Sequence, residues 1–332
     1  MKGPLGMYPT LYHFGVIPIP DFICQLPLIG RLLGKTIPIG IHSYGVMMAL
    51  AFLSVFFGLQ RELPRKNINV QLAHSIIVHA VFGGIVGAKI YYAIEFQDLS
   101  ALFSSSGLVW YGGLIGGSAA VLYTIHRSGN PILPTIDAIG PLLLLGHGFG
   151  RIGCLLAGDG CYGRRCTLPW PWGMEFPAGI KPTIDPFSGE VFSVYPTPLY
   201  EFLMMVVAFS LFWYFRKKLE RIPGVIFGVV LIYAGVERFI IEFWRRNERY
   251  IYWQDGHVFF NKLEFSDQLS MPFGFSGSQL ISILLWIPIG IFLVYWSRKR
   301  PIVILDEPLS DPQLPDVSVK KTPKKRKKKH RA

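Results

Sequence analysis

The sequence predicts an all-α fold, a polytopic membrane bundle of about seven transmembrane helices. Of the 332 residues, 51% are hydrophobic and only 16% are charged, whereas soluble globular domains carry about 25% charged residues. The apolar residues gather in runs of about 20, the length that a helix needs to cross a hydrocarbon core of about 30 Å. This composition excludes a soluble enzyme, a disordered chain and a secreted disulfide scaffold.

Seven apolar runs mark the predicted spans, near residues 39–59, 70–96, 108–125, 132–156, 197–215, 225–243 and 276–296. Basic residues follow the first, third, fifth and seventh runs: Arg61, Arg65 and Lys66, then Arg127, then Arg216, Lys217, Lys218 and Arg221, then Arg298, Lys299 and Arg300. Because such residues favour the cytoplasmic side, we expect the N-terminus outside and the C-terminus inside. Two longer segments, about 157–196 and 244–275, then form irregular extracytoplasmic segments.

Residues 1–38 precede the first span and do not match a cleaved signal peptide. Lys2 is a lone basic residue, and several prolines interrupt the apolar core that a signal peptide requires, namely Pro4, Pro9, Pro18 and Pro20. We therefore expect residues 1–38 to be an extracytoplasmic or interfacial segment, residues 39–297 to form the transmembrane domain, and residues 298–332 to form a tail.

The tail explains most of the net charge of +12, since it holds nine of the 33 lysines and arginines: Lys320, Lys321, Lys324, Lys325, Arg326, Lys327, Lys328, Lys329 and Arg331. A basic run can indicate nucleic-acid binding. On a membrane protein the favoured interpretation is a disordered cytoplasmic tail drawn to anionic lipid. We expect membrane lipids as partners and no nucleic acid.

Glycines recur four residues apart in three of the spans. The pairs are Gly83 with Gly87, Gly112 with Gly116, Gly113 with Gly117, and Gly146 with Gly150. This spacing lets helix backbones approach closely where water provides no driving force. It predicts close helix packing, a structural role.

Charged residues inside the spans are the candidate functional groups, because a charge at mid-bilayer usually faces a cavity, a partner or a substrate. Arg151 lies near the outer end of the fourth span, and Asp159 follows beyond it. Gly158, Gly160 and Gly163 permit a tight turn that can approach a ligand. The alternative for Arg151 is a side chain that extends to the lipid headgroups.

The sixth span carries Arg238 and Glu242 four residues apart, on one helix face. They line a pocket together, or they form an ion pair that only packs the bundle. Arg245 and Arg246 follow at the outer boundary, where we expect them to be interfacial.

The fifth and third spans begin with further polar side chains. Glu201 lies in the first turn of the fifth span, where the helix dipole favours a carboxylate, and Tyr111 opens the third span near the interface. Arginines and carboxylates from several spans thus converge on the outer half of one bundle. Because guanidinium groups match phosphate oxygens, this predicts an anionic, phosphate-bearing lipid ligand; a substrate carboxylate or a proton path would also fit.

The four cysteines are Cys24, Cys154, Cys161 and Cys166. The last three, taken with His147, have spacings that match no closed zinc pattern, so we expect no metal and no other cofactor. Cys161 and Cys166 are candidates for a disulfide if their loop faces an oxidising compartment.

Motifs from about Ile41 to Trp296 together resemble those of the prolipoprotein diacylglyceryl transferase family, bacterial membrane enzymes that begin lipoprotein maturation. The segments that carry the resemblance, with the region around Asp137, are IHSYGVMMAL, GAKIYY, YGGLIGG, GRIGCLLAGDGCYG, YPTPLYE and ERFIIEFWR. Each is weak alone, but their order along seven spans is specific.

The resemblance implies that phosphatidylglycerol donates a diacylglyceryl group to the lipobox cysteine thiol of a preprolipoprotein, forming a thioether and releasing glycerol phosphate. Arg151 would bind the headgroup, Arg238 would neutralise the departing phosphate, and Glu242 would orient Arg238. Tyr44, Asp159, Gly163 and Glu201 would complete the substrate site. The implied location is the bacterial cytoplasmic (inner) membrane, with the active site toward the outer face.

The sequence departs from the family pattern at several positions. Cys154 and Ala157 replace asparagines, one residue is inserted before Gly163, and Ala234 replaces a tyrosine. Tyr111 replaces the histidine often given a base role, and a phenol with a pKa near 10 is a poor base. These changes predict a divergent member with the same reaction, or a relative with a different acceptor; because both arginines are retained, we favour the first.

The main alternative from a different class is a transporter or lipid-binding membrane protein that uses the same arginines for an anionic headgroup. Transporters commonly carry paired, interrupted helices in two related halves. No such pattern is visible in the sequence, and the enzyme is therefore the favoured interpretation.

Overall fold

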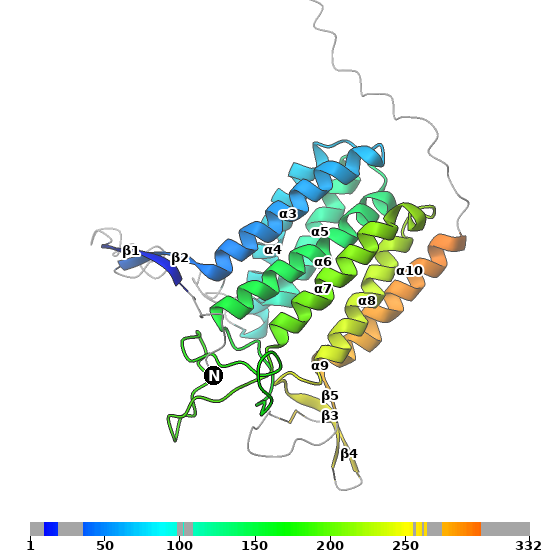
Figure 1. The fold of residues 1–332 in the computed structure, drawn as a ribbon. Coiled ribbons are helices and arrows are strands. Elements are labelled where there is room, and N and C mark those ends of the chain that lie inside the picture. The colour runs from blue at the N-terminus through cyan, green and yellow to red at the C-terminus, as the bar shows by residue number, and fades with distance from the viewer. Residues whose placement is uncertain are drawn as a thin grey trace, which may run out of the picture. The chain divides into compact units, whose positions relative to one another are not determined.

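A helix coincides with each of the seven predicted spans in a computed structural model, which describes residues 10–18, 36–97, 102, 109–254, 257–260, 262–263 and 274–299. In chain order these are α3 (Ser43–Arg65), α4 (Leu72–Glu95), α5 (Trp110–Arg127), α6 (Ile132–Ala157), α7 (Thr197–Leu219), α8 (Val225–Ile241) and a last helical run made of α9 (Gly277–Ile281), the π-helical turn η2 (Ser282–Trp286) and α10 (Ile287–Lys299). The helices lie side by side in one bundle (Figure 1). Cys24 and residues 300–332, with the predicted basic tail, lie outside the described residues.

Among the described residues, five helical segments are long and apolar enough to cross a membrane: α3, α4, α6, α7 and the run Gly277–Lys299. This confirms a mostly helical protein with several membrane helices. Helix α8 has 17 residues, a length of about 26 Å at 1.5 Å per residue, and α5 falls outside the same criteria. Seven crossings and the N-out, C-in orientation therefore stay predictions.

Helix α6 is the centre of the bundle and packs against α3, α7 and α8. Half of its apolar window is buried, compared with 17–22% in the other four candidate spans. Those outer helices expose large apolar side chains such as Phe57, Phe82, Leu284 and Phe292. An apolar surface of this size suits contact with lipid rather than with water.

The predicted glycine spacing sets the contact between α4 and α5. A Cβ atom added at Gly87 would collide with the carbonyl oxygen of Gly112, and one at Gly116 would collide with that of Gly83. The two backbones can touch only because these positions lack side chains, which confirms the structural role predicted for both pairs.

The start of α8 is capped by a side chain from α6. Asp137 Oδ2 accepts a hydrogen bond from Gly224 N at 2.6 Å, and Oδ1 accepts one from Phe227 N at 2.8 Å. Backbone N–H groups in the first turn of a helix lack partners within it. Asp137 supplies the missing acceptors and holds α8, which carries Arg238, against α6.

A charged network joins the C-terminal ends of α3 and α7. Arg216 Nε lies 2.7 Å from Glu62 Oε1, and Arg65 Nη1 lies 2.6 Å from Glu220 Oε1. The two helix ends that carry predicted flanking basic residues therefore lie on the same side of the bundle.

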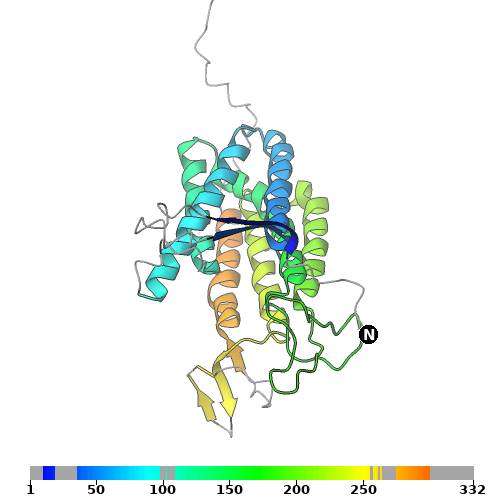
Figure 2. The ribbon, with the colours of Figure 1, turned by 90° about the vertical axis from the view of Figure 1, so that its left-hand side faces the viewer.

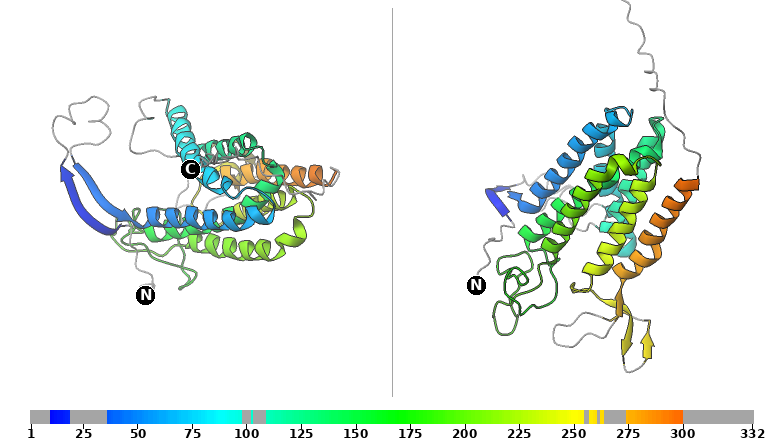
Figure 3. Two further views of the ribbon diagram at one scale, coloured as in Figure 1. Left: turned by 90° about the horizontal axis from the view of Figure 1, so that it is seen from above. Right: turned by 45° about the vertical axis from the view of Figure 1, so that its right-hand side comes forward.

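Short strands occupy segments that the sequence analysis expected to be irregular or helical. They are β1 (Thr10–Pro18), β2 (Thr36–His42), β3 (Arg249–Gln254), β4 (His257–Phe259) and β5 (Gly274–Ser276), arranged as the antiparallel pair β1–β2 and the sheet β4–β3–β5. Strand β2 continues into α3 (Figure 3), so the first helix begins four residues later than predicted. An apolar run alone does not distinguish a strand from the start of a helix.

The two outer segments gather at one end of the bundle, with the β4–β3–β5 sheet beside the loop of residues 158–196 (Figures 1 and 2). That loop has a small apolar core in which Tyr162, Met174, Phe176 and Val194 pack with Leu155 of α6. It is therefore a folded cap over the end of the bundle where α6 ends and α7 begins.

Candidate active site

Arg151 is held by two neighbours in the outer half of the bundle. It lies in the penultimate turn of α6, and its Nε lies 2.7 Å from Glu201 Oε2 in the first turns of α7. The same nitrogen donates to His147 Nε2, one turn earlier on α6, at 3.0 Å. Glu201 is completely buried. The Arg151 side chain is therefore held inside the bundle and does not extend toward lipid headgroups.

Arg245 is the second partner of Glu201. Its Nη1 lies 2.9 Å from Glu201 Oε1, and its side chain is 11% exposed. The backbone of Arg245 pairs with Gly163 of the cap loop. The expectation that Arg245 is interfacial is therefore wrong: the chain folds back after α8 and carries this arginine into the bundle.

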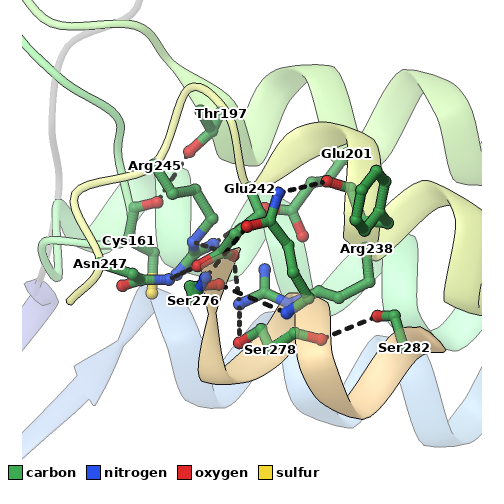
Figure 4. Close-up of polar contacts among 12 residues, drawn as sticks. Cys161, Thr197, Glu201, Arg238, Glu242, Arg245, Asn247, Ser276, Ser278 and Ser282 are labelled. Carbon is green, nitrogen blue, oxygen red and sulfur yellow. Dashed lines mark hydrogen bonds and ion pairs between the residues drawn. The ribbon is translucent and has the colours of Figure 1, made fainter. Parts of the chain in front are cut away.

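Arg238 and Glu242 form the second half of the cluster (Figure 4). Arg238 Nη2 lies 3.0 Å from Glu242 Oε2 and donates to Ser278 Oγ of α9 at 3.0 Å. Glu242 also accepts a hydrogen bond from Asn247, and Arg245 Nε lies 3.9 Å away. The predicted pair at positions i and i+4 is thus present, and it is joined to the Glu201 group through Arg245.

Two guanidinium nitrogens in this cluster are buried without a hydrogen bond among the described residues, Arg245 Nε, which has only the ion pair with Glu242 at 3.9 Å, and Arg238 Nη1, which has no ion pair either. Arg238 Nη1 is buried and makes no hydrogen bond within the part of the chain that the structure describes. A buried donor left unpaired costs roughly 1–3 kcal/mol, and more when it is charged. Such a group fits an acceptor that arrives from outside the protein, such as a phosphate oxygen.

The cluster is a preorganised cationic site. Three guanidinium groups, from Arg151, Arg238 and Arg245, share two buried glutamates, Glu201 and Glu242. Removing one partner of a buried ion pair costs about 3–5 kcal/mol, which keeps the arginines in place before a ligand binds. The arrangement can bind an anion and stabilise negative charge that develops on it.

The remaining predicted substrate residues lie around the end of α6. Tyr44, near the start of α3, is 43% exposed, and its ring packs against Gly153 of α6. Asp159 Oδ1 accepts a hydrogen bond from Cys161 N at 3.0 Å. Gly163 N donates to Tyr195 O at 2.7 Å, and an added Cβ there would collide with Trp244 O. Gly163 is thus required for the close approach that brings Arg245 to the cluster.

Tyr111 is not brought to the arginines by any contact in the described part of the chain. It lies in the first turn of α5, and its ring meets Trp110 edge-on, with centroids 5.1 Å apart. Through Arg245 the structure connects four predicted residues, Arg151, Arg238, Glu201 and Glu242. Among the described contacts, Tyr111 takes no part in this network.

Sequence reasoning missed several members of the cluster. His147 was weighed only as a metal ligand, and Arg245, Asn247 and Ser278 were not predicted as site residues. Glu237, beside Arg238, is also buried, and its Oε1 has no partner among the described residues. His147 lies one turn before Arg151 on the same helix, a spacing that could have signalled contact.

The three described cysteines are free thiols, so Cys161 and Cys166 do not form a disulfide in this structure. The Cys166 sulfur lies 3.6 Å from the Trp172 carbonyl oxygen. A hydrogen bond from the Cys154 thiol, with the positive charge of Arg245, lowers the pKa of Cys161 to about 7.

The chain is similar to known proteins over most of its length. The family model described as prolipoprotein diacylglyceryl transferase matches residues 32–296. A phosphatidylglycerol–prolipoprotein diacylglyceryl transferase of Clostridium tetani is 32% identical over 269 residues, covering 78% of this chain and 94% of the relative. Proteins of the same name from Leptospira interrogans and Chromohalobacter salexigens are 26% and 28% identical, over 78% and 80% of this chain and 90% and 91% of theirs.

Proposed function

Because the chain belongs to the prolipoprotein diacylglyceryl transferase family, we propose that its arginine cluster carries out the transfer for which these relatives are named. The protein is a transferase of the membrane that uses phosphatidylglycerol and prolipoproteins as substrates. The acceptor that we propose is the thiol of the lipobox cysteine. The comparisons give no support to a transporter or a purely lipid-binding protein.

The donor phosphate is the group that the cluster recognises. Arg151, oriented by Glu201 and His147, binds the headgroup from α6, and Arg238 approaches from α8. The observation that carries this assignment is the buried Nη1 of Arg238, which has no partner among the described residues. A guanidinium group that already holds Glu242 through Nη2 can offer Nη1 to a phosphate oxygen.

The chemistry is a displacement at a saturated carbon of the glycerol backbone. The thiolate sulfur forms a thioether bond to that carbon while the bond between carbon and phosphate oxygen breaks. The electron pair of the broken bond goes to the phosphate oxygen, and glycerol phosphate leaves. Negative charge grows on the leaving group, and preorganised donors aimed at such charge are usually the largest single contribution to catalysis. Arg238 provides this stabilisation, with Glu242 as the residue that orients it.

The other predicted residues have positioning roles in the proposal. Tyr44, Asp159 and Gly163 lie around the end of α6, where we place the substrate. Tyr111 belongs to the catalytic set by its place in the family pattern. Its described contact is with Trp110, and a phenol is a poor base at neutral pH. Ionisation of the acceptor thiol therefore requires a group other than Tyr111.

The proposed location is the bacterial inner membrane, with the site toward the outer face. The cluster lies where α6 ends, α7 begins and α8 ends, beneath the cap loop. The opposite end of the bundle carries basic residues in the last turns of α3 and α7, and such residues favour the cytoplasmic side.

Release of glycerol phosphate from phosphatidylglycerol labelled in its headgroup tests the site. Arg151→Ala and Arg238→Ala should each abolish release that depends on a lipobox peptide. Because each removes one ion-pair partner from a buried glutamate, the double variant Arg238→Gln with Glu242→Gln is measured as well, since it removes both charges of that ion pair. Arg165→Ala is the matched control, because Arg165 pairs with Asp185 on the cap loop, away from the cluster.

Two results would contradict the assignment. One is normal release in the Arg151→Ala and Arg238→Ala proteins. The other is binding of phosphatidylglycerol by the wild-type protein without cleavage, which would favour the lipid-binding alternative.

A further inference from the structure

Three potential metal ligands converge where the chain turns back at the end of α6. One thiol comes from the last turn of the helix, at Cys154, and the loop supplies the carboxylate of Asp159 and the thiol of Cys161. Their ligand atoms all lie within 4.8 Å of one another. Sequence analysis weighed a different set, with His147 and Cys166, which the structure does not bring together.

We propose that Cys154, Asp159 and Cys161 form a zinc site whose fourth position receives the acceptor cysteine thiol. This inference rests on the proposed function, because it assigns the missing step of that reaction, the ionisation of the thiol. Three protein ligands with one open position are the usual arrangement of catalytic zinc, whereas structural zinc sites have four protein ligands.

The backbone explains how residues from a helix and a loop meet. Gly158 ends α6 in the left-handed conformation, with φ of +59°, and Gly160 follows with φ of +89°. These two glycines reverse the chain, so that Cys161 comes back over Cys154. The hydrogen bond from Cys161 N to Asp159 Oδ1, at 3.0 Å, holds the carboxylate beside the two thiols.

The donor types and their spacing suit zinc. Thiolates select soft or borderline ions such as zinc, with bonds of about 2.3 Å to sulfur and 2.0–2.2 Å to carboxylate oxygen. Tetrahedral coordination at these lengths puts neighbouring ligand atoms about 3.5–3.8 Å apart. The ligand atoms therefore need to move only about 1 Å closer to one another. The loop that carries Asp159 and Cys161 is already turned toward the helix that carries Cys154.

Positively charged side chains lie close to the three ligands. Arg151 lies one turn before Cys154 on α6, and Arg245 pairs with the same glutamate, Glu201, that holds Arg151. Two thiolates and one carboxylate exceed the charge of a divalent ion by one negative charge. The neighbouring guanidinium groups offset that excess, and they also connect the site to the phosphate-binding cluster through Glu201.

The step balances without any further reagent. The acceptor thiol binds as the fourth ligand and loses its proton to water, since a coordinating thiol is deprotonated. Its sulfur then forms the bond to the glyceryl carbon, and the bond from that carbon to the phosphate oxygen breaks with its electron pair on the oxygen. Glycerol phosphate leaves beside Arg238. The product thioether is neutral, so it binds the metal more weakly than the thiolate and departs.

Metal content and cobalt spectroscopy of the full-length protein in detergent test the proposal independently of turnover. The purified protein is stripped with a chelator, reloaded with Zn²⁺ or Co²⁺ and desalted. We expect one ion per chain, and a cobalt spectrum with thiolate-to-metal charge transfer that changes on addition of a lipobox peptide but not of its Cys→Ser version. Cys154→Ser, Cys161→Ser and Asp159→Asn should each weaken zinc binding by at least about 100-fold. Cys166→Ser is the matched control and should keep the ion, because its thiol lies outside the set.

Four results would overturn the proposal. These are wild-type protein that retains no zinc, a Cys154–Cys161 disulfide detected by mass, a zinc ion retained by the Cys154→Ser, Cys161→Ser double variant, and a cobalt spectrum that the peptide leaves unchanged. A protein that transfers lipid at full rate after complete chelation would refute the zinc site and leave the transferase assignment intact. Zinc bound with no transfer under any condition would refute the assignment instead.

Discussion

Replacing Arg238 with lysine removes a donor from the cluster while keeping its charge. Both described contacts of Arg238, to Glu242 Oε2 and to Ser278 Oγ, are made by Nη2 at 3.0 Å. Nη1 is buried and unpaired among the described residues. A lysine has a single nitrogen, and Glu242 would hold it, so the substrate phosphate would lose its donor. Loss of one preorganised donor to a developing anion costs about 10²–10³ in kcat, or about 2.7–4 kcal/mol.

The variant should remain folded, because Glu242 keeps a cationic partner and the cost of about 3–5 kcal/mol for an unpaired buried charge is avoided. Initial rates of glycerol phosphate release over a range of phosphatidylglycerol concentrations separate kcat from KM, and thermal unfolding in detergent checks the fold. Arg165→Lys is the control, since Arg165 pairs with Asp185 outside the cluster. A rate within about threefold of wild type, or a change in KM alone, would refute the argument from the unpaired nitrogen.

Three further predictions follow from the packing, the capping and the thiols. Gly87→Leu should prevent α4 from packing on α5 and lower the yield of folded protein in size-exclusion chromatography. Gly45→Ala is the control and should not lower the yield, because a Cβ atom added there meets nothing within 4 Å. Equal yields of the two variants would contradict the packing argument. Asp137→Ala should lower unfolding stability by about 0.5–2 kcal/mol through loss of the α8 cap, measured by thermal unfolding, and an unchanged Tm would contradict it. In metal-free protein, the alkylation rate of Cys161 should rise with pH with a midpoint near 7 rather than 9, because its pKa is lowered to about 7 and the thiolate is the reactive form. Cys161→Ser should remove this part of the alkylation. A midpoint near 9 would contradict the prediction.

The helices and half of the cluster could be predicted from the sequence because both depend on local spacing. Apolar runs of helical length gave the spans, and the spacing of Arg238 and Glu242 placed them on one face. Glu201 was predicted as a substrate-binding residue from the family resemblance, through the segment YPTPLYE. The pairing of Arg151 with Glu201 required only that two helix ends meet at the same side of the bundle.

The rest depends on how the chain folds back between helices. Arg245 follows an apolar run, where a basic residue is usually interfacial, and only the pairing of its backbone with Gly163 carries it inward. The meeting of Cys154 with Cys161 depends in the same way on the left-handed turn at Gly158. Neither contact follows a regular spacing of residues along the chain, so a sequence pattern cannot reveal it.

The most direct test of the central claim is the mass of the acceptor after reaction. Purified full-length protein is mixed with phosphatidylglycerol and a peptide that carries a lipobox cysteine, with a Cys→Ser peptide and the Arg238→Gln, Glu242→Gln double variant as controls. A gain of one diacylglyceryl group on the cysteine peptide, with the wild-type protein only, is the result that we predict. An unmodified peptide in the presence of folded protein with bound lipid would contradict the account.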